Sequence, residues 1–320
     1  MTAATRLHPC AEQLQLASTI EASLVTLLPL SRLHASYEED VKTWSSLEEI
    51  GVFRICMDEQ HGGSGLGATE EALITIGLGQ RLAAPSVFAT IGAAHAPLDA
   101  GSGLGKRRVA AAYRHGARVL FVEDSQADLL LLRDSLSASL HSLRSCTSSQ
   151  LDQGLWLVRM SEITQLSAPL AQLDASQLLR LRLLDAAALT GIAQATLDMS
   201  VAYAQTRMQF GRPIGTFQAV KHHCANMAIA ARCARDQTTF AAIALDESRD
   251  DTELQIECAL FVGGSAALEN AGKCIQIHGG MGFSDEADPH LFLKRAQVLI
   301  AIAGGLEAAN ARIASMRVDA

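Results

Sequence analysis

Long apolar stripes at helical spacing run through the second half of the chain, and they restrict its possible folds more than any other feature. One run within residues 176–316 contains Leu184, Ala188, Ile192, Ala195, Met199 and Ala202. A second run, with one position skipped, contains Val220, Cys224, Met227, Ala231, Ala234, Ala241 and Leu245. Steps of three and four residues place each run on one helix face, and such faces pack inward in a helical bundle. Pro213 and Gly215 separate the two helices.

The first half of the chain shows two other residue patterns. Leucine and isoleucine recur at helical spacing from about Ala11 to Ala112, which predicts helices. From Val119 to about Leu166, short apolar runs are broken by Asp, Ser and Gly, which is typical of strands. The predicted strands are residues 118–122, 129–132 and 155–158, of which the second could also be helical.

These residue patterns predict a mainly α protein with three domains. They are an N-terminal helical domain at 1–115, a reduced β middle domain at 116–170 and a C-terminal helical bundle at 171–320. The glycine-rich loop at 59–67 has a spacing close to that of a dinucleotide fingerprint. No strand precedes this loop, so we interpret it as a structural connector.

Composition excludes several classes of protein. No apolar run approaches the ~18–20 residues of a membrane span, and residues 1–16 lack the apolar core of a secretory signal. The net charge is −8 without a basic stripe, which argues against a nucleic-acid partner. Seven cysteines without a CxxC pair favour a reduced, cytoplasmic protein. Cys224 follows His222 and His223, but it lies on an apolar stripe, so no metal site is predicted.

The stretch from Ala204 to Gln218 is the first candidate binding motif. Arg207 is expected at a helix C-terminus, where its planar fork of donors suits a phosphate. Phe210 offers a flat apolar face for a ring, and Gly211 lets a ligand approach the backbone. Taken alone, this pattern favours a capped helix end with a surface arginine.

The second motif is the run Q-I-H-G-G-M-G-F, which begins at Gln276. Three glycines within four residues expose the backbone to a ligand, and the Gln276 amide can both donate and accept. We interpret His278 as a contact residue and not as an acid or base.

Together and in this order, R-x-x-F-G-x-x-[IL]-x-x-F-Q and Q-I-H-G-G-M-G-F resemble the C-terminal half of the acyl-CoA dehydrogenase family. The resemblance covers residues 176–320 well and the N-terminal helices loosely. It implies FAD as the cofactor and a C-terminal four-helix bundle. It also implies that a set of residues holds the ADP portion of a flavin seated in the neighbouring subunit across a dimer interface. These residues are Arg207, Phe210, Gly211, Gln218, Gln276, Ile277, His278, Gly279 and Gly280.

The chain departs from the family at the catalytic base. Family members remove the α-proton of an acyl thioester with a carboxylate, which must lie within hydrogen-bond reach of that proton. Most place it where this chain has Ala303, and others where it has Leu181, so no catalytic residue is assigned. Asp185 and Glu307 lie one helical turn from these positions and are the two candidate substitutes.

The middle region departs as well. The T-E-P-x-x-G-S-D segment with which the family cradles the flavin ring is missing, and residues 105–176 are few for the whole β-domain. We therefore expect that this chain does not seat an isoalloxazine ring of its own.

Both departures are consistent with the short subunit of a heteromeric acyl-CoA dehydrogenase of the kind used in bacterial steroid degradation. Its partners would be a longer catalytic subunit, an acyl-CoA substrate and an electron-transfer flavoprotein. One alternative is a self-sufficient FAD dehydrogenase with a non-standard base. Another is a non-catalytic helical scaffold.

Overall fold

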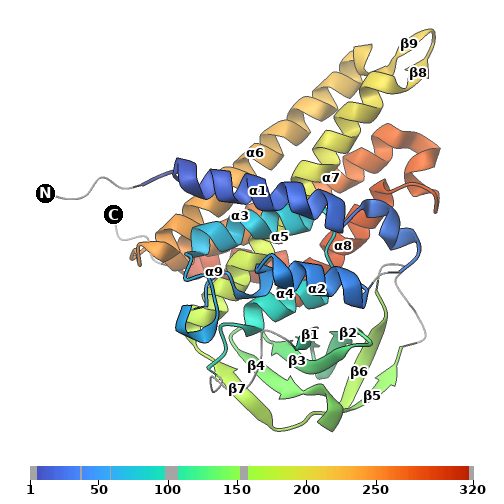
Figure 1. The fold of residues 1–320 in the computed structure, drawn as a ribbon. Helices are drawn as coiled ribbons and strands as arrows, with labels where there is room; N and C mark the ends of the chain where they lie inside the picture. Colours follow the sequence, from blue (N-terminus) through green and yellow to red (C-terminus); the bar gives the residue numbers. More distant parts are fainter. Residues whose placement is uncertain (1–5, 37, 58, 98–106, 152–157, 317–320) are drawn as a thin grey trace, which may run out of the picture.

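The computed structural model describes residues 6–36, 38–57, 59–97, 107–151 and 158–316. A layered array of helices lies above a twisted sheet, and two long helices project away from it at the far end (Figure 1). The N-terminal helices are α1 (Ala11–Leu27), α2 (Val41–Glu49), α3 (Ala68–Gln80) and α4 (Pro85–Ala93), with short 3₁₀ turns at Leu30–His34, Val52–Arg54 and Glu59–His61.

Seven strands form the sheet in the order β5-β6-β2-β1-β3-β4-β7. Their bounds are β1 (Arg108–His115), β2 (Arg118–Val122), β3 (Ala127–Arg133), β4 (Ala138–Ser142), β5 (Thr147–Gln150), β6 (Met160–Gln165) and β7 (Pro169–Leu173). Neighbouring strands are antiparallel except for β1 and β3, which run parallel. Alternate residues face opposite sides. Leu129 and Leu131 therefore join the main core under the helices, whereas Leu130 and Leu132 join a smaller cluster on the outer face.

The predicted strands at 118–122 and 129–132 are confirmed by β2 and β3. Of the strand predicted at 155–158, residues 155–157 lie outside the described part of the chain. The expected helical pattern up to about Ala112 is wrong at its end, because Arg108–His115 form β1. Its alanines have a high helix propensity. Pairing with β2 and β3 and burial beneath α4 outweigh that local preference.

The C-terminal half is helical, as the stripes predict. Its helices are α5 (Ala175–Thr206), α6 (Gln218–Asp246), α7 (Thr252–His278), α8 (Pro289–Ile302) and α9 (Leu306–Ser315). Helix α5 lies at the centre and contacts α3, α6, α7 and α8. Small residues bring the axes close, since a Cβ on Gly191 would meet the carbonyl oxygen of Ile76 at 2.1 Å. The mainly α fold with a small middle sheet and a helical bundle is therefore confirmed.

The glycine-rich loop at 59–67 leads into α3 and is fixed there by the bundle. The Asp246 carboxylate, at the end of α6, accepts hydrogen bonds from Ala68 N at 2.6 Å and Thr69 N at 2.9 Å. It also accepts one from the Thr69 hydroxyl at 2.6 Å. A carboxylate at this position satisfies free N–H groups and the positive end of the helix dipole. These contacts support the interpretation of the loop as a structural connector.

A buried ionic cluster holds the sheet and three helices together. Glu257 on α7 is fully buried and accepts from Arg182 on α5 at 2.6 Å. Arg312 on α9 binds both oxygens of the same carboxylate, at 2.7 and 2.8 Å. Arg182 also donates to the carbonyl oxygen of Ser135, in the turn between β3 and β4. This network fixes the sheet against the central helix.

By length and composition, one helical stretch could cross a membrane, Ala11–His34 near the N-terminus, and only 11% of it is buried. A single helix of this kind is weak support for a membrane span. Within the described residues, no group of three or more potential metal ligands is found, and the seven cysteines are free thiols.

Candidate cofactor-contact site

The first motif forms an exposed hairpin at the outer tip of the long helices (Figure 1). Helix α5 ends at Thr206, Arg207 is its C-cap, and β8 (Met208–Gln209) pairs with β9 (Arg212–Pro213). The turn residues Phe210 and Gly211 have φ angles of +51° and +76°. Tight two-residue hairpins need this left-handed backbone, which glycine adopts at the lowest cost. The Phe210 side chain is 91% exposed.

Aromatic contacts fix the hairpin against the start of α6. The Phe210 ring meets the Phe217 ring edge-on, with 6.1 Å between centroids. The Arg212 guanidinium lies 4.3 Å from the centroid of the Phe217 ring and makes a cation–π contact with it. Phe217 is the N-cap of α6, and Gln218 is the first residue of that helix. Gln218 is thereby held next to the hairpin, with its side chain exposed.

The second motif closes α7 and begins a short 3₁₀ turn, η7 (Gly279–Phe283). Gly279 has a φ angle of +63°, and a Cβ added to Gly279 or Gly280 would meet nothing within 4 Å. Gly282 differs, because its Cβ would lie 2.6 Å from the carbonyl oxygen of Ile275. The first two glycines therefore leave open backbone at the surface, and the third permits close packing.

The fold brings the two motifs side by side. His278, the last residue of α7, stacks on Tyr203 of α5, with 4.0 Å between ring centroids. Its Nδ1–H donates to the carbonyl oxygen of Cys274 at 2.7 Å, and burial lowers the pKa of the imidazole. Ile277 of the second motif and Ile214 of the first pack in the same apolar cluster. Tyr203 was missed by the sequence reasoning, although it lies one helical turn before Arg207.

Polar groups at this tip are free to bind a ligand. Among the described residues, the side chains of Arg207, Gln218 and Gln276 have no hydrogen-bond or ion-pair partner, and all three are exposed. An arginine fork can hold a pyrophosphate, and the amides can donate to or accept from a nucleoside. Phe210 and the 70%-exposed Phe283 add apolar faces. The open backbone of Gly279 and Gly280 leaves room for a ligand, so the residues present fit the ADP portion of FAD.

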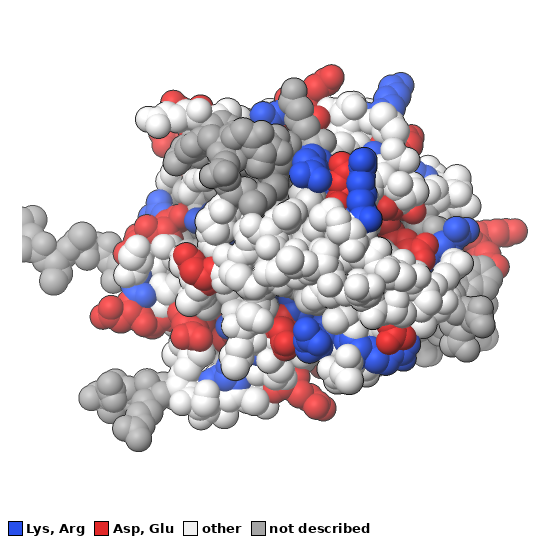
Figure 2. Space-filling view, turned by 90° about the horizontal axis from the view of Figure 1, so that it is seen from below, with Lys and Arg blue, Asp and Glu red and all other residues white. Residues whose placement is uncertain are grey.

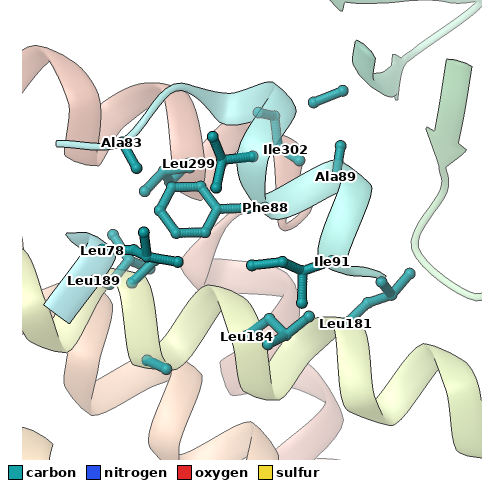
Figure 3. Close-up of a cluster of buried hydrophobic side chains, with 14 of the residues drawn as sticks. Leu78, Ala83, Phe88, Ala89, Ile91, Leu181, Leu184, Leu189, Leu299 and Ile302 are labelled. Carbon is teal, nitrogen blue, oxygen red and sulfur yellow. The ribbon is translucent and has the colours of Figure 1, made fainter. Parts of the chain in front are cut away.

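The two positions where the family places its base, Leu181 and Ala303, belong to the main apolar core. Figure 3 shows Leu181 among side chains of α4, α5 and α8. Leu181 is 3% exposed and Ala303 is 8% exposed. Leu181 and Ile302, the neighbour of Ala303, line the same cavity, whose volume is about 20 Å³. Phe88, Leu184 and Leu299 fill much of the space around it. A cavity of this size holds about one water molecule.

Neither of the candidate substitute bases is a free carboxylate among the described residues that line this cavity. Asp185 reaches the cavity, but its Oδ2 lies 2.6 Å from the Arg133 Nη2, and both side chains are buried. Burial raises the pKa of Asp185 despite the opposing attraction of Arg133. Glu307 is exposed in the first turn of α9. The Arg133 contact could not be found from sequence, because it depends on how β3 packs against α5.

Comparison with known proteins gives a consistent result. The family model "Acyl-CoA dehydrogenase, C-terminal domain" matches residues 172–318. The acyl-CoA dehydrogenase IpdE2 of Mycobacterium tuberculosis is 30% identical over 266 residues, which is 80% of each chain. The acyl-CoA dehydrogenase FadE34 of the same organism is 48% identical over 122 residues, which is 38% of this chain and 17% of that protein.

Among solved structures, the ChsE4-ChsE5 complex from Mycobacterium tuberculosis contains a chain with the same fold. The TM-score is 0.77 at 20% identity, and the match covers 98% of this chain and 100% of that chain. The family model, the long relative and the fold agree with each other. The chain therefore belongs to the acyl-CoA dehydrogenase family, whose members are FAD-dependent oxidoreductases.

Proposed function

We propose that this chain is the non-catalytic subunit of a heteromeric acyl-CoA dehydrogenase. It supplies contacts to the ADP portion of an FAD whose flavin ring is seated in a longer, catalytic subunit. The reaction would be the α,β-desaturation of an acyl-CoA, for which the bound FAD would supply the hydride-accepting chemistry. The domain boundaries 1–115, 116–170 and 171–320 stay a prediction, with the change that β1 (Arg108–His115) belongs to the sheet of the middle domain.

The proposal rests on one observation: among the described residues, no free carboxylate lines the buried cavity. An α-proton is removed only by a base within hydrogen-bond reach. Leu181 and Ala303 cannot accept a proton, and Asp185 is held by Arg133 at 2.6 Å. A cavity of about 20 Å³ also leaves no room for an acyl chain. The proton abstraction is therefore assigned to the partner subunit.

The exposed tip supports the same assignment. Arg207, Gln218 and Gln276 point away from the core and have no partner among the described residues. Such a surface suits a ligand that is bound mainly by another chain, with this chain completing the binding site. Arg207 would offset the charge of the pyrophosphate, and the 276–280 segment would orient the adenosine.

The comparisons favour a heteromeric assembly. The similar solved chain comes from a structure named as a complex of two proteins, ChsE4 and ChsE5. By analogy, this chain would pair with a longer family member in a soluble, cytoplasmic heterotetramer. A bulky polycyclic acyl-CoA of steroid degradation is the proposed substrate class, and an electron-transfer flavoprotein is the proposed acceptor.

The proposal is tested by co-expression with a longer acyl-CoA dehydrogenase from the same source. Flavin bound per complex is measured for the wild type and for Arg207→Ala. We expect Arg207→Ala to lower flavin retention, because the pyrophosphate of FAD loses the positive charge of the Arg207 guanidinium. Arg232→Ala is the matched control, since Arg232 is exposed on α6 and, within the described part of the chain, pairs with Asp236 alone, at 2.7 Å. Equal flavin content in all three complexes would contradict the proposal.

A further inference from the structure

A second pocket is lined by residues on the outer face of the sheet. The sheet lies at the opposite end of the molecule from the hairpin tip (Figure 1). Its volume is about 330 Å³, within the range of small-molecule sites. Ala138 and Leu140 of β4 belong to the core under the helices, so Ser139 and His141 face the other side and line this pocket. Figure 2 shows this end of the molecule, where a broad uncharged area is bordered by side chains of both signs.

Ser139 and His141 form a hydrogen-bonded pair with a defined direction. The His141 Nδ1 lies 2.8 Å from the carbonyl oxygen of Ser167, which can only accept, so Nδ1 carries the proton. In the neutral ring Nε2 is then a bare acceptor. The Ser139 Oγ lies 2.8 Å from this Nε2 and donates its proton to it. The imidazole is 3% exposed, so its orientation is fixed by packing.

The sheet register adds a donor beside this pair. Ser139 lies directly opposite Gln172 of the edge strand β7, and both line the pocket. Directly paired residues have Cβ atoms about 4.5–5.5 Å apart on one face. Among the described residues the Gln172 amide has no hydrogen-bond partner, so its N–H₂ is available to a bound oxygen. Side-chain amides serve this purpose in oxyanion holes.

We propose that Ser139 is a nucleophile activated by His141, and that this pocket hydrolyses a short activated acyl group, an ester or thioester. The Ser139 Oγ forms a bond to the acyl carbon while its proton passes to His141 Nε2. The carbonyl oxygen becomes an oxyanion near Gln172. The bond to the alcohol or thiol then breaks, and His141 returns the proton to that leaving group. Water attacks the acyl-serine, passing its proton through His141, and the carboxylic acid leaves. No flavin takes part.

The test is covalent labelling of the full chain with a fluorophosphonate probe, followed by peptide mass spectrometry, alongside hydrolysis of p-nitrophenyl acetate and of a short acetyl thioester. We expect the probe on Ser139. Ser139→Ala is expected to slow hydrolysis by at least about 100-fold, the usual size of a lost base-assisted nucleophile. The two acyl substrates decide between an ester and a thioester preference.

Ser149→Ala is the matched control, because Ser149 is exposed on β5 of the same sheet and is not among the described residues that line this pocket. It is expected to keep both labelling and hydrolysis. The labelled position in the wild type is independent of whether any variant folds. An unlabelled Ser139 in the wild type would overturn the proposal, and so would hydrolysis by a folded Ser139→Ala at the wild-type rate.

Discussion

His278 stacks on Tyr203 with 4.0 Å between ring centroids, and this contact joins the end of α7 to the end of α5. It places the two sequence motifs on one surface, although about seventy residues separate them in the chain. Together with the apolar contact of Ile277 and Ile214, the stack holds Arg207 and the 276–280 segment on one surface, where they can contact one ligand together.

Replacing Tyr203 tests this coupling. We expect Tyr203→Ala to reduce flavin retention in the assembled enzyme, because His278 loses the face against which it packs and the glycine turn shifts. Tyr203→Phe keeps the ring and should behave as the wild type. Flavin absorbance per complex after gel filtration gives the comparison. Equal retention in Tyr203→Ala and Tyr203→Phe would show that the stack does not organise the site.

A substitution of Asp185 distinguishes the proposed function from that of a self-sufficient dehydrogenase. If Asp185 were the base, Asp185→Asn would lower turnover by at least about 100-fold. We expect instead that the variant keeps near wild-type turnover in the assembled complex. Its thermal stability should fall, because Arg133 loses its buried partner at 2.6 Å. Measuring kcat and Tm on the same preparation distinguishes the two roles.

The carboxylate that caps α3 should contribute measurably to stability. Asp246→Ala removes acceptors for Ala68 N, Thr69 N and the Thr69 hydroxyl. Loss of such a cap costs about 1–2 kcal/mol of unfolding free energy. Asp250→Ala is a suitable control, since Asp250 is exposed nearby and has no partner among the described residues. Urea unfolding that ranks the two variants equally would argue against the cap.

The buried Glu71 should make stability depend on pH in the acid range. Burial raises its pKa, but His95 at 2.9 Å and Arg180 at 3.1 Å outweigh burial and hold the pKa below the usual 4.5. A lowered pKa means that the stabilisation is present above pH 4.5 and is lost as the pH falls through the folded-state pKa.

Glu71→Gln is therefore expected to lose about 1–3 kcal/mol near neutral pH, because the charge-assisted bonds are removed. The difference from wild type should shrink below pH 4.5. Unfolding free energies measured by urea titration across this range test the sign. A gap that widens on acidification would be inconsistent with the stabilising role of the ionised carboxylate.

Much of the fold could be predicted from sequence, because helices with regular stripes reveal their inward faces locally. The runs around Leu184 and Met227 correspond to α5 and α6, and the turn chemistry around Gly211 marks the hairpin between them. β1 was missed at residues 108–112, since an alanine-rich strand has a helical composition and is decided by its neighbours in the sheet.

The candidate site was only partly accessible to the same reasoning. Arg207 and Gln276 could be proposed from their motifs, yet Tyr203 and Arg133 act through contacts between distant segments. The pair of Ser139 and His141 could likewise not be predicted from sequence. Its geometry depends on the carbonyl group of Ser167 and on the register with β7.

The central claim is that this chain completes a flavin site without holding the flavin by itself. The visible spectrum of the purified chain, scored as FAD bound per chain, tests it most directly. The account predicts a colourless protein that acquires flavin only when it is purified with a longer family member. A yellow protein with close to one FAD per chain would contradict the account.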